Sequence, residues 1–301
     1  MLDVCIIGHI TSDINQTPKN EIKEMPGGTA YYSSLTLKNL GSKVCVVTKT
    51  AKRDKGLLGI LKEVNIPVFH QESQKTTIFE NIYPKDFNTR IQNVKTVAEP
   101  FNVGDISEML KKDFSSRIFH LGPLTKEDMP LEILKRLSRK AKISLDAQGF
   151  VRKIDNSKVK NVDWEEKKEG LTYINILHID ETEAKILSGE KDIKKAATKL
   201  SIYGIDEIII TCGTSGSLIY SKREFYPIPS FSPRKIVDTT GCGDTYVAAY
   251  IHKRLKSSDI NEAGRFAAAT SALKAESFGA FKGREETVHK FLEYQYKVIK
   301  D

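Results

Sequence analysis

The stretch that decides the fold is VDTTGCGDTY, residues 237–246. It precedes residues 247–255, in which apolar side chains recur at helical spacing. Glycine lets a chain turn tightly and leaves its amide accessible, and a helix start adds unpaired N–H groups and the positive end of the helix dipole. The sequence therefore predicts an anion-binding site at Gly241, Cys242 and Gly243, where this helix begins.

Asp244 lies beside the predicted anion site. A carboxylate there can accept a proton from a hydroxyl as that hydroxyl attacks phosphorus, while the neighbouring amides stabilise charge on the transferred phosphoryl group. The alternative is that Asp244 caps the helix and the glycines only turn the chain. For an isolated GxGD we would prefer this alternative, but the flanking residues 238–240 and the small-residue helix that follows favour the chemical interpretation.

Short apolar runs alternate with helical patterns along the rest of the chain. Strands are expected at residues 4–7, 44–47, 68–70, 117–121, 142–145, 174–179 and 208–210, and helices at 30–40, 55–64, 131–140, 180–187 and 193–203. Continuously apolar strands that alternate with helices are typical of a parallel sheet with both faces covered. The expected fold class is therefore α/β, with a doubly wound, mostly parallel sheet flanked by helices.

Residues 75–100 differ from this pattern, because their apolar residues partly alternate with polar ones, as in exposed strands. With residues 14–26 they are expected to form a small β-strand lid. No internal repeat or low-complexity linker interrupts the sequence. We expect a single domain over residues 1–301.

Composition excludes several classes of protein. The chain has no run of about 18 uncharged apolar residues, so no membrane span is expected. Its net charge of +8 comes from lysines mixed with acidic residues, which indicates a solvated surface and not a nucleic-acid-binding patch. The four cysteines form no CxxC pair, so buried free thiols and a cytoplasmic location are expected.

Two segments resemble signatures of the PfkB (ribokinase-like) carbohydrate kinases. Residues 238–244 look like the DTxGxGD signature, and Gly27-Gly28 followed by a helix that ends at Leu40-Gly41 resembles the other signature. The order of elements from residue 3 to about 290 fits as well. The resemblance implies a ribokinase-like fold and transfer of the γ-phosphoryl group of ATP to a hydroxyl.

The resemblance also assigns roles around the anion site. It implies that Asp244 is the catalytic base and that Gly241, Cys242 and Gly243 supply the anion hole. Many members carry alanine where Cys242 stands, and the contacting group there is the main-chain N–H. Several members are activated by potassium, and Asp238 and Thr240 match positions that contribute to that site; the alternative is that Asp238 only caps the turn through Thr240.

The phosphoryl-donor side rests on two further segments. Thr211, Gly213 and Gly216 lie in a polar turn after the strand at 208–210 and are similar to the ATP-contacting loop of the family, although an ordinary turn would look the same. Glu183 resembles the glutamate of the NxxE motif, which organises Mg²⁺ through water. The alternative is a capping box between Asp180 and Glu183.

The acceptor side is expected to be formed by residues that the family comparison places against the substrate. These residues are Asp13, Gly28, Tyr32, Asp146, Gln148 and Arg152. Tyr32 stands where ribose-type members carry asparagine, and residues 146–152 are similar to the DxQGxxR stretch of inositol-kinase-like relatives. Both features favour a cyclitol over ribose. A capping aspartate at 13, a core tyrosine at 32 and a surface arginine at 152 are the structural alternatives.

The sequence thus predicts an ATP-dependent carbohydrate kinase that uses Mg²⁺, with K⁺ as a further candidate cofactor. Its partner would be a sugar or cyclitol, with neither nucleic acid nor membrane involved. Two alternatives stay open: a nucleoside kinase of the same fold, and a non-catalytic nucleotide or sugar sensor. The edge strands of the lid could also pair two chains into a homodimer.

Overall fold

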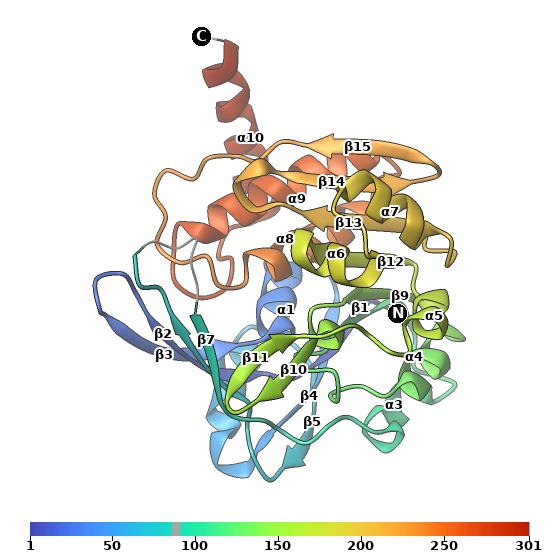
Figure 1. The fold of residues 1–301 in the computed structure, drawn as a ribbon. Coiled ribbons are helices and arrows are strands. Elements are labelled where there is room, and N and C mark those ends of the chain that lie inside the picture. Colours follow the sequence, from blue (N-terminus) through green and yellow to red (C-terminus); the bar gives the residue numbers. More distant parts are fainter. Residues whose placement is uncertain (86–90, 301) are drawn as a thin grey trace.

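The computed structural model describes residues 1–85 and 91–300, and its central feature is a nine-stranded sheet (Figure 1). The strand order is β15-β14-β13-β12-β9-β8-β1-β4-β5. The strands are β1 (Leu2–Gly8), β4 (Val44–Ala51), β5 (Val68–Ser73), β8 (Ser116–Gly122), β9 (Lys142–Asp146), β12 (Ile176–Asp180), β13 (Glu207–Thr211), β14 (Ser217–Ser221) and β15 (Glu224–Ile228). All neighbours from β5 to β13 are parallel, and β14 and β15 are antiparallel. The predicted doubly wound, mostly parallel sheet is confirmed.

Helices cover both faces of this sheet. Ile6 and Val46 pack in one core cluster with residues of α1, α8, α9 and α10, whereas Ile7 and Val47 pack in a second cluster with residues of α3, α4, α6 and α7. Successive side chains of a strand point to opposite faces, so a sheet buried on both sides needs strands that are apolar at nearly every position. This explains the unbroken apolar runs in the sequence.

The helices of the described chain are α1 (Thr29–Asn39), α2 (Gly59–Glu63), α3 (Ser107–Leu110), α4 (Leu131–Ser138), α5 (Lys167–Gly170), α6 (Glu181–Ser188), α7 (Ile193–Ser201), α8 (Cys242–Arg254), α9 (Ile260–Ala275) and α10 (Glu285–Lys300). Short 3₁₀ turns are η1 (Lys52–Leu58), η2 (Val103–Ile106), η3 (Gly149–Val151), η4 (Leu171–Tyr173) and η5 (Gly213–Ser215). The helix predicted at 55–64 is wrong in form, since η1 and α2 share that range. Gly56 and Gly59 lie inside it, and each lowers helix stability by about 1 kcal/mol relative to alanine.

A second, six-stranded sheet forms the lid, in the order β10-β11-β7-β6-β2-β3. Its strands are β2 (Thr11–Gln16), β3 (Ile22–Gly27), β6 (Ile78–Ile82), β7 (Ile91–Thr96), β10 (Arg152–Asp155) and β11 (Lys158–Asn161). The predicted lid is confirmed, but its third segment, 152–161, was not predicted. Residues 86–90 of the predicted lid lie outside the described residues. A homodimer through the edge strands β3 and β10 stays a prediction.

Two smaller expectations concern cysteines and membranes. All four cysteines are free; Cys5 and Cys45 are buried, as expected, whereas Cys212 and Cys242 are only half-buried. In residues 1–85 and 91–300, no helix combines the length and the hydrophobicity that a bilayer span requires.

Candidate active site

A cavity of about 620 Å³ opens between the lid and the carboxyl ends of the parallel strands. Asp146, Asp180 and Thr211 are the last residues of β9, β12 and β13, and all three line it. Thirteen of the predicted site residues line it as well: Asp13, Gly28, Tyr32, Asp146, Gln148, Arg152, Glu183, Thr211, Thr240, Gly241, Cys242, Gly243 and Asp244. Gly213, Gly216 and Asp238 do not line the cavity. The carboxyl edge of a parallel sheet is where α/β proteins usually bind ligands.

The anion-binding turn lies on the cavity wall, at the start of α8. Gly241 is the N-cap residue, with a φ of 79°, and no side chain of the described residues caps the helix. A Cβ at Gly241 would lie 2.3 Å from the ring of Tyr32, so only glycine fits between the turn and this ring. Asp244 therefore does not act as the helix cap. The amide of Cys242 donates to the carbonyl of Thr239 at 3.2 Å, so the Cys242 amide expected in the anion hole is already paired. The amides of Gly241 and Gly243 are left for a ligand, as expected for an anion site.

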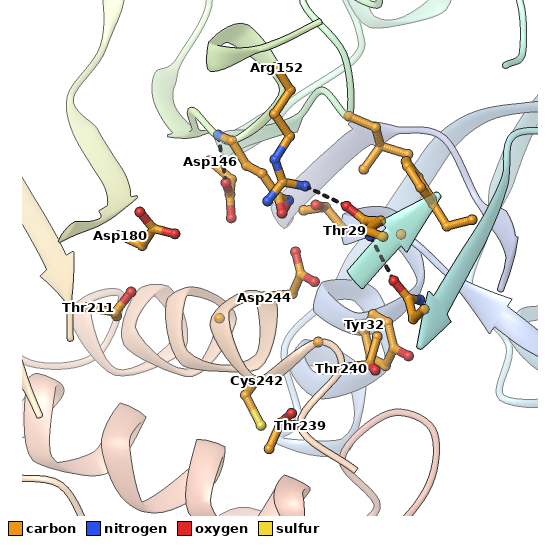
Figure 2. Close-up of a pocket in the computed structure, with 18 of the residues that line it drawn as sticks. Thr29, Tyr32, Asp146, Arg152, Asp180, Thr211, Thr239, Thr240, Cys242 and Asp244 are labelled. Atoms are coloured by element: carbon orange, nitrogen blue, oxygen red, sulfur yellow. Dashed lines mark hydrogen bonds between the residues drawn. The ribbon is translucent and has the colours of Figure 1, made fainter. Parts of the chain in front are cut away.

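Asp244 lies near the middle of the labelled side chains in Figure 2, with Asp180 and Thr211 to one side and Thr29 and Tyr32 to the other. Its Oδ1 is buried and has no hydrogen-bond partner among the described residues. Burial, followed by the charge of Asp146, raises the pKa of Asp244 to about 6, although the Thr29 hydroxyl opposes the rise. A carboxylate with an unpaired oxygen and a pKa near neutrality is suited to accept a proton.

Asp13 faces the cavity from the lid strand β2. Its Oδ1 accepts a hydrogen bond from the Thr11 hydroxyl at 2.6 Å, which fixes the carboxylate. A Cβ on Gly27 would lie 2.2 Å from Oδ2 of Asp13, so this glycine leaves the space that the carboxylate occupies. Gly28 follows as the N-cap of α1 and lines the same cavity. The glycine pair Gly27-Gly28 of the first signature therefore lies next to Asp13.

Tyr32 both packs in the core and faces the cavity, which were the two roles considered for it from the sequence. Only 1% of the residue is exposed, and it belongs to the core cluster, yet it also lines the cavity. Its hydroxyl has no partner among the described residues. Burial, followed by the charge of Asp13, raises the pKa of Tyr32 well above its usual value, so the hydroxyl stays protonated. Tyr32 can offer a ligand an apolar wall and one hydroxyl.

A hydrogen-bonded chain of three residues crosses the floor of the cavity. Nδ1 of His178 lies 3.0 Å from Oδ2 of Asp146, and Nε2 lies 3.3 Å from the Thr211 hydroxyl. Burial disfavours the charged imidazole, but Asp146, together with the charges of Glu183 and Asp244, raises the pKa of His178 overall. His178 was not predicted from the sequence. The one available signal was a polar residue inside an otherwise apolar strand.

The lid carries a second polar chain that was not predicted. The Asn81 side-chain amide donates to Oδ1 of Asn15 at 2.8 Å, and that of Gln92 donates to Oδ1 of Asn81 at 2.8 Å. Arg152 in turn donates to Oε1 of Gln92 at 3.4 Å (dashed lines in Figure 2). Strands β2, β6, β7 and β10 each contribute one of these residues. Arg152 is thus part of the cavity wall, on the same side as the lid amides.

Asp180 and Glu183 form a capping box, which was the alternative to a role of Glu183 in binding magnesium. The amide of Glu183 donates to Oδ1 of Asp180 at 2.8 Å, and the amide of Asp180 donates to Oε2 of Glu183 at 2.8 Å. Both residues still line the cavity. Burial, followed by the charge of Asp180, raises the pKa of Glu183 to about 7. The capping box therefore does not remove Glu183 from the site.

These acids fit a magnesium ion that is held mainly through water. No group of three or more His, Cys, Asp or Glu residues within the described chain could hold a metal ion by itself. Magnesium usually keeps several waters and binds through one or two carboxylates together with ligand phosphates. Asp180 and Glu183 supply such carboxylates in the same cavity as the anion-binding turn.

Comparison with known families identifies the chain. A model described as pfkB family carbohydrate kinase matches residues 1–287. The chain belongs to this family, and both signature segments lie within the matched residues.

Several relatives are similar over most of their length. The cytidine kinase of Thermococcus kodakarensis is 29% identical over 255 residues, which are 83% of this chain and 88% of that protein. The structure of a pyrophosphate-dependent kinase of the ribokinase family with a pyrophosphate analogue and myo-inositol is 28% identical, with a TM-score of 0.84, and the match covers 95% of this chain and 99% of that chain. Arabidopsis thaliana ribokinase, solved with ribose and ATP, shares the fold at 19% identity and a TM-score of 0.76, over 97% of this chain and 99% of that chain.

Proposed function

We propose that this carbohydrate kinase phosphorylates a hydroxyl of a cyclitol of the inositol type, with Asp244 as the base. The observation that carries the proposal is the position of Asp244. Its unpartnered carboxylate oxygen lies in one cavity with the uncapped start of α8 and with the polar residues of the lid. A phosphate at the helix start and a hydroxyl from the lid side would meet at this carboxylate.

The chemistry follows from these positions. Asp244 takes the proton from the acceptor hydroxyl as the hydroxyl oxygen attacks the terminal phosphorus of the donor. The bridging P–O bond of the donor breaks, and ADP leaves if the donor is ATP, or phosphate if it is pyrophosphate. The amides of Gly241 and Gly243 hold the phosphoryl oxygens, where the positive end of the helix dipole adds to their effect. When Mg²⁺ is bound near Asp180 and Glu183, it neutralises charge on the donor phosphates.

The acceptor pocket suits a compact polyol. Asp13 can accept hydrogen bonds from two neighbouring hydroxyls, and Arg152 and Gln92 can donate to others. The ring of Tyr32 would lie against the carbon face of the acceptor. Likeness to the structure solved with myo-inositol, over nearly the whole chain, supports a cyclitol. The likeness to a cytidine kinase makes a nucleoside the second candidate acceptor.

The donor must carry a terminal phosphoanhydride, which both ATP and inorganic pyrophosphate have. Gly213 and Gly216, which were expected to contact ATP, lie outside the cavity, whereas the phosphate-binding turn lies on its wall. Three solved structures at 27–29% identity are described as pyrophosphate-dependent kinases. These observations favour pyrophosphate as an alternative to the expected ATP.

The test is a matrix of donors and acceptors. ATP and pyrophosphate are each combined with inositols, pentoses, hexoses and nucleosides, and the phosphorylated product is detected by mass spectrometry and ³¹P NMR. We expect an inositol to have the highest kcat/KM. A nucleoside that exceeds every inositol tenfold would overturn the cyclitol assignment, and ligand binding without turnover would indicate a sensor. Asp244→Asn serves as the inactive control.

A further inference from the structure

A lysine is buried beneath the anion-binding turn. Lys274 lies near the end of α9 and has an exposed fraction of 0%, whereas lysine is rarely buried without a paired charge. Its Nζ donates to the main-chain carbonyl oxygen of Asp238 at 2.8 Å and to Oδ2 of the same residue at 3.2 Å. The ammonium also lies 5.5 Å from the centre of the Tyr32 ring. Asp238, which is 1% exposed, is thus paired through both its main chain and its side chain.

This contact lies where the turn is tied to the rest of the fold. The other carboxylate oxygen of Asp238 accepts a hydrogen bond from the amide of Thr240 at 2.9 Å, which is the turn cap considered in the sequence analysis. The amides of Val237 and Asp238 both donate to the carbonyl of Ala275, the last residue of α9. The Ser271 hydroxyl donates to the carbonyl of Cys242 at 3.0 Å. Helix α9 therefore holds both sides of the turn.

A potassium ion does not fit beside Asp238. Asp238 and Thr240 were expected to contribute to a potassium site, but the carbonyl and one carboxylate oxygen of Asp238 are occupied by the ammonium. The Thr240 hydroxyl lies 2.9 Å from that of Tyr83. A second cation would need the same oxygens and would lie within a few ångströms of the first, where the two charges repel each other.

We propose that Lys274 is a built-in cation that fixes the anion-binding turn, and that it makes phosphoryl transfer independent of monovalent cations. The ammonium holds the Asp238 carbonyl toward α9, on the side away from the cavity. With that peptide fixed, the turn keeps the amides of Gly241 and Gly243 directed at the phosphate site. Lys274 is a positioning residue, and this role rests on the proposed function of the turn.

The first experiment compares cations. Turnover is measured in potassium, sodium and tetramethylammonium chloride at matched ionic strength, so that screening is held constant. The wild-type chain is expected to give rates within about twofold in all three salts. Activation by potassium of about fivefold or more over tetramethylammonium would overturn the proposal.

The second experiment removes the ammonium. Lys274→Ala leaves space beside Asp238, and we expect turnover to fall at least about tenfold in tetramethylammonium and to rise again in potassium. Lys274→Met fills the space without a charge and should stay impaired in every salt. Lys195→Met, on the exposed face of α7, is the matched control. Wild-type turnover in Lys274→Met would overturn the proposal.

Two thermal measurements separate positioning from folding. Potassium should raise the melting temperature of Lys274→Ala but not that of the wild type, and this readout needs neither donor nor acceptor, so it stands even if the proposed function fails. The double variant Lys274→Met/Asp238→Asn removes both buried charges and should melt above Lys274→Met, because no uncompensated carboxylate is left. If the double variant also recovers wild-type turnover, Lys274 is only structural.

Discussion

Replacement of Asp244 by asparagine tests the proposed chemistry most directly. Asparagine keeps the shape of the side chain but cannot accept the proton, so kcat should fall by at least about 100-fold. The burial that raises the pKa of Asp244 also penalises its charged form in the folded state. Asp244→Asn should therefore melt at or above the wild-type temperature near pH 8, where the carboxylate is charged. An inactive variant with this melting temperature has lost a functional group and not its fold.

The pKa of Asp244 sets the size of the pH effect. With a pKa of about 6, close to nine-tenths of the side chain is ionised at about pH 7 and close to one-tenth at about pH 5. Because only the ionised form can act as a base, kcat/KM should fall about tenfold between these two pH values. An aspartate with the ordinary pKa of 3.8 would give a nearly flat profile in this range.

The assay follows product formation at saturating donor while the acceptor concentration and the pH are varied. Glu183 needs a control, because its pKa of about 7 would also produce a change in rate in this range. Glu183→Gln removes that titration and should leave the decrease near pH 6 in place. A flat profile in the wild type, or turnover of Asp244→Asn within a few-fold of the wild type, would refute the reasoning.

Three further substitutions test the acceptor pocket. Asp13→Ala should raise the KM of the acceptor at least about tenfold with little change in the KM of the donor; equal losses would place Asp13 elsewhere. Tyr32→Phe should melt at a higher temperature, because an unpartnered buried hydroxyl costs about 1–3 kcal/mol, and should weaken acceptor binding; an unchanged acceptor KM would show that the ring only packs. Gln92→Leu breaks the lid chain next to Arg152 and should change which hydroxyl is phosphorylated, as seen by NMR of the product; an unchanged isomer would argue against a role in orientation.

Local sequence was enough for the parallel strands of the central sheet but not for its β14–β15 hairpin or for the β10–β11 hairpin of the lid. The buried parallel strands are read from continuous apolar runs, but β10 and β11 are four residues each and mostly polar, and β11 is stabilised by pairing with β7. The β14–β15 hairpin turns through Lys222 and Arg223, both at positive φ. Asn-Gly or Asp-Gly is the usual signal for such a turn. A Lys-Arg pair is not such a signal, so this hairpin could not be predicted from its turn residues.

The same limit applies to the site. Motif residues such as Asp244 and Gly241 could be located because their function requires a fixed local spacing. His178 and Lys274 depend on contacts with residues 32 and 36 positions away, and neither residue lies in a recognisable motif. A lysine near a helix end usually complements the helix dipole at the surface. Its burial follows from the packing of α9 against the turn, which no short window of sequence contains.

The contact between Tyr32 and Gly241 also limits how this chain can diverge. The ring that would face the acceptor lies against the glycine of the phosphate-binding turn, and the Lys274 ammonium is close to the same ring. A smaller residue at 32 would leave the turn unsupported, and a larger one would displace it. A lineage that changes its acceptor at this position must therefore acquire a compensating change beneath the turn. Related chains that differ at position 32 should therefore also differ in the residues beneath the phosphate-binding turn.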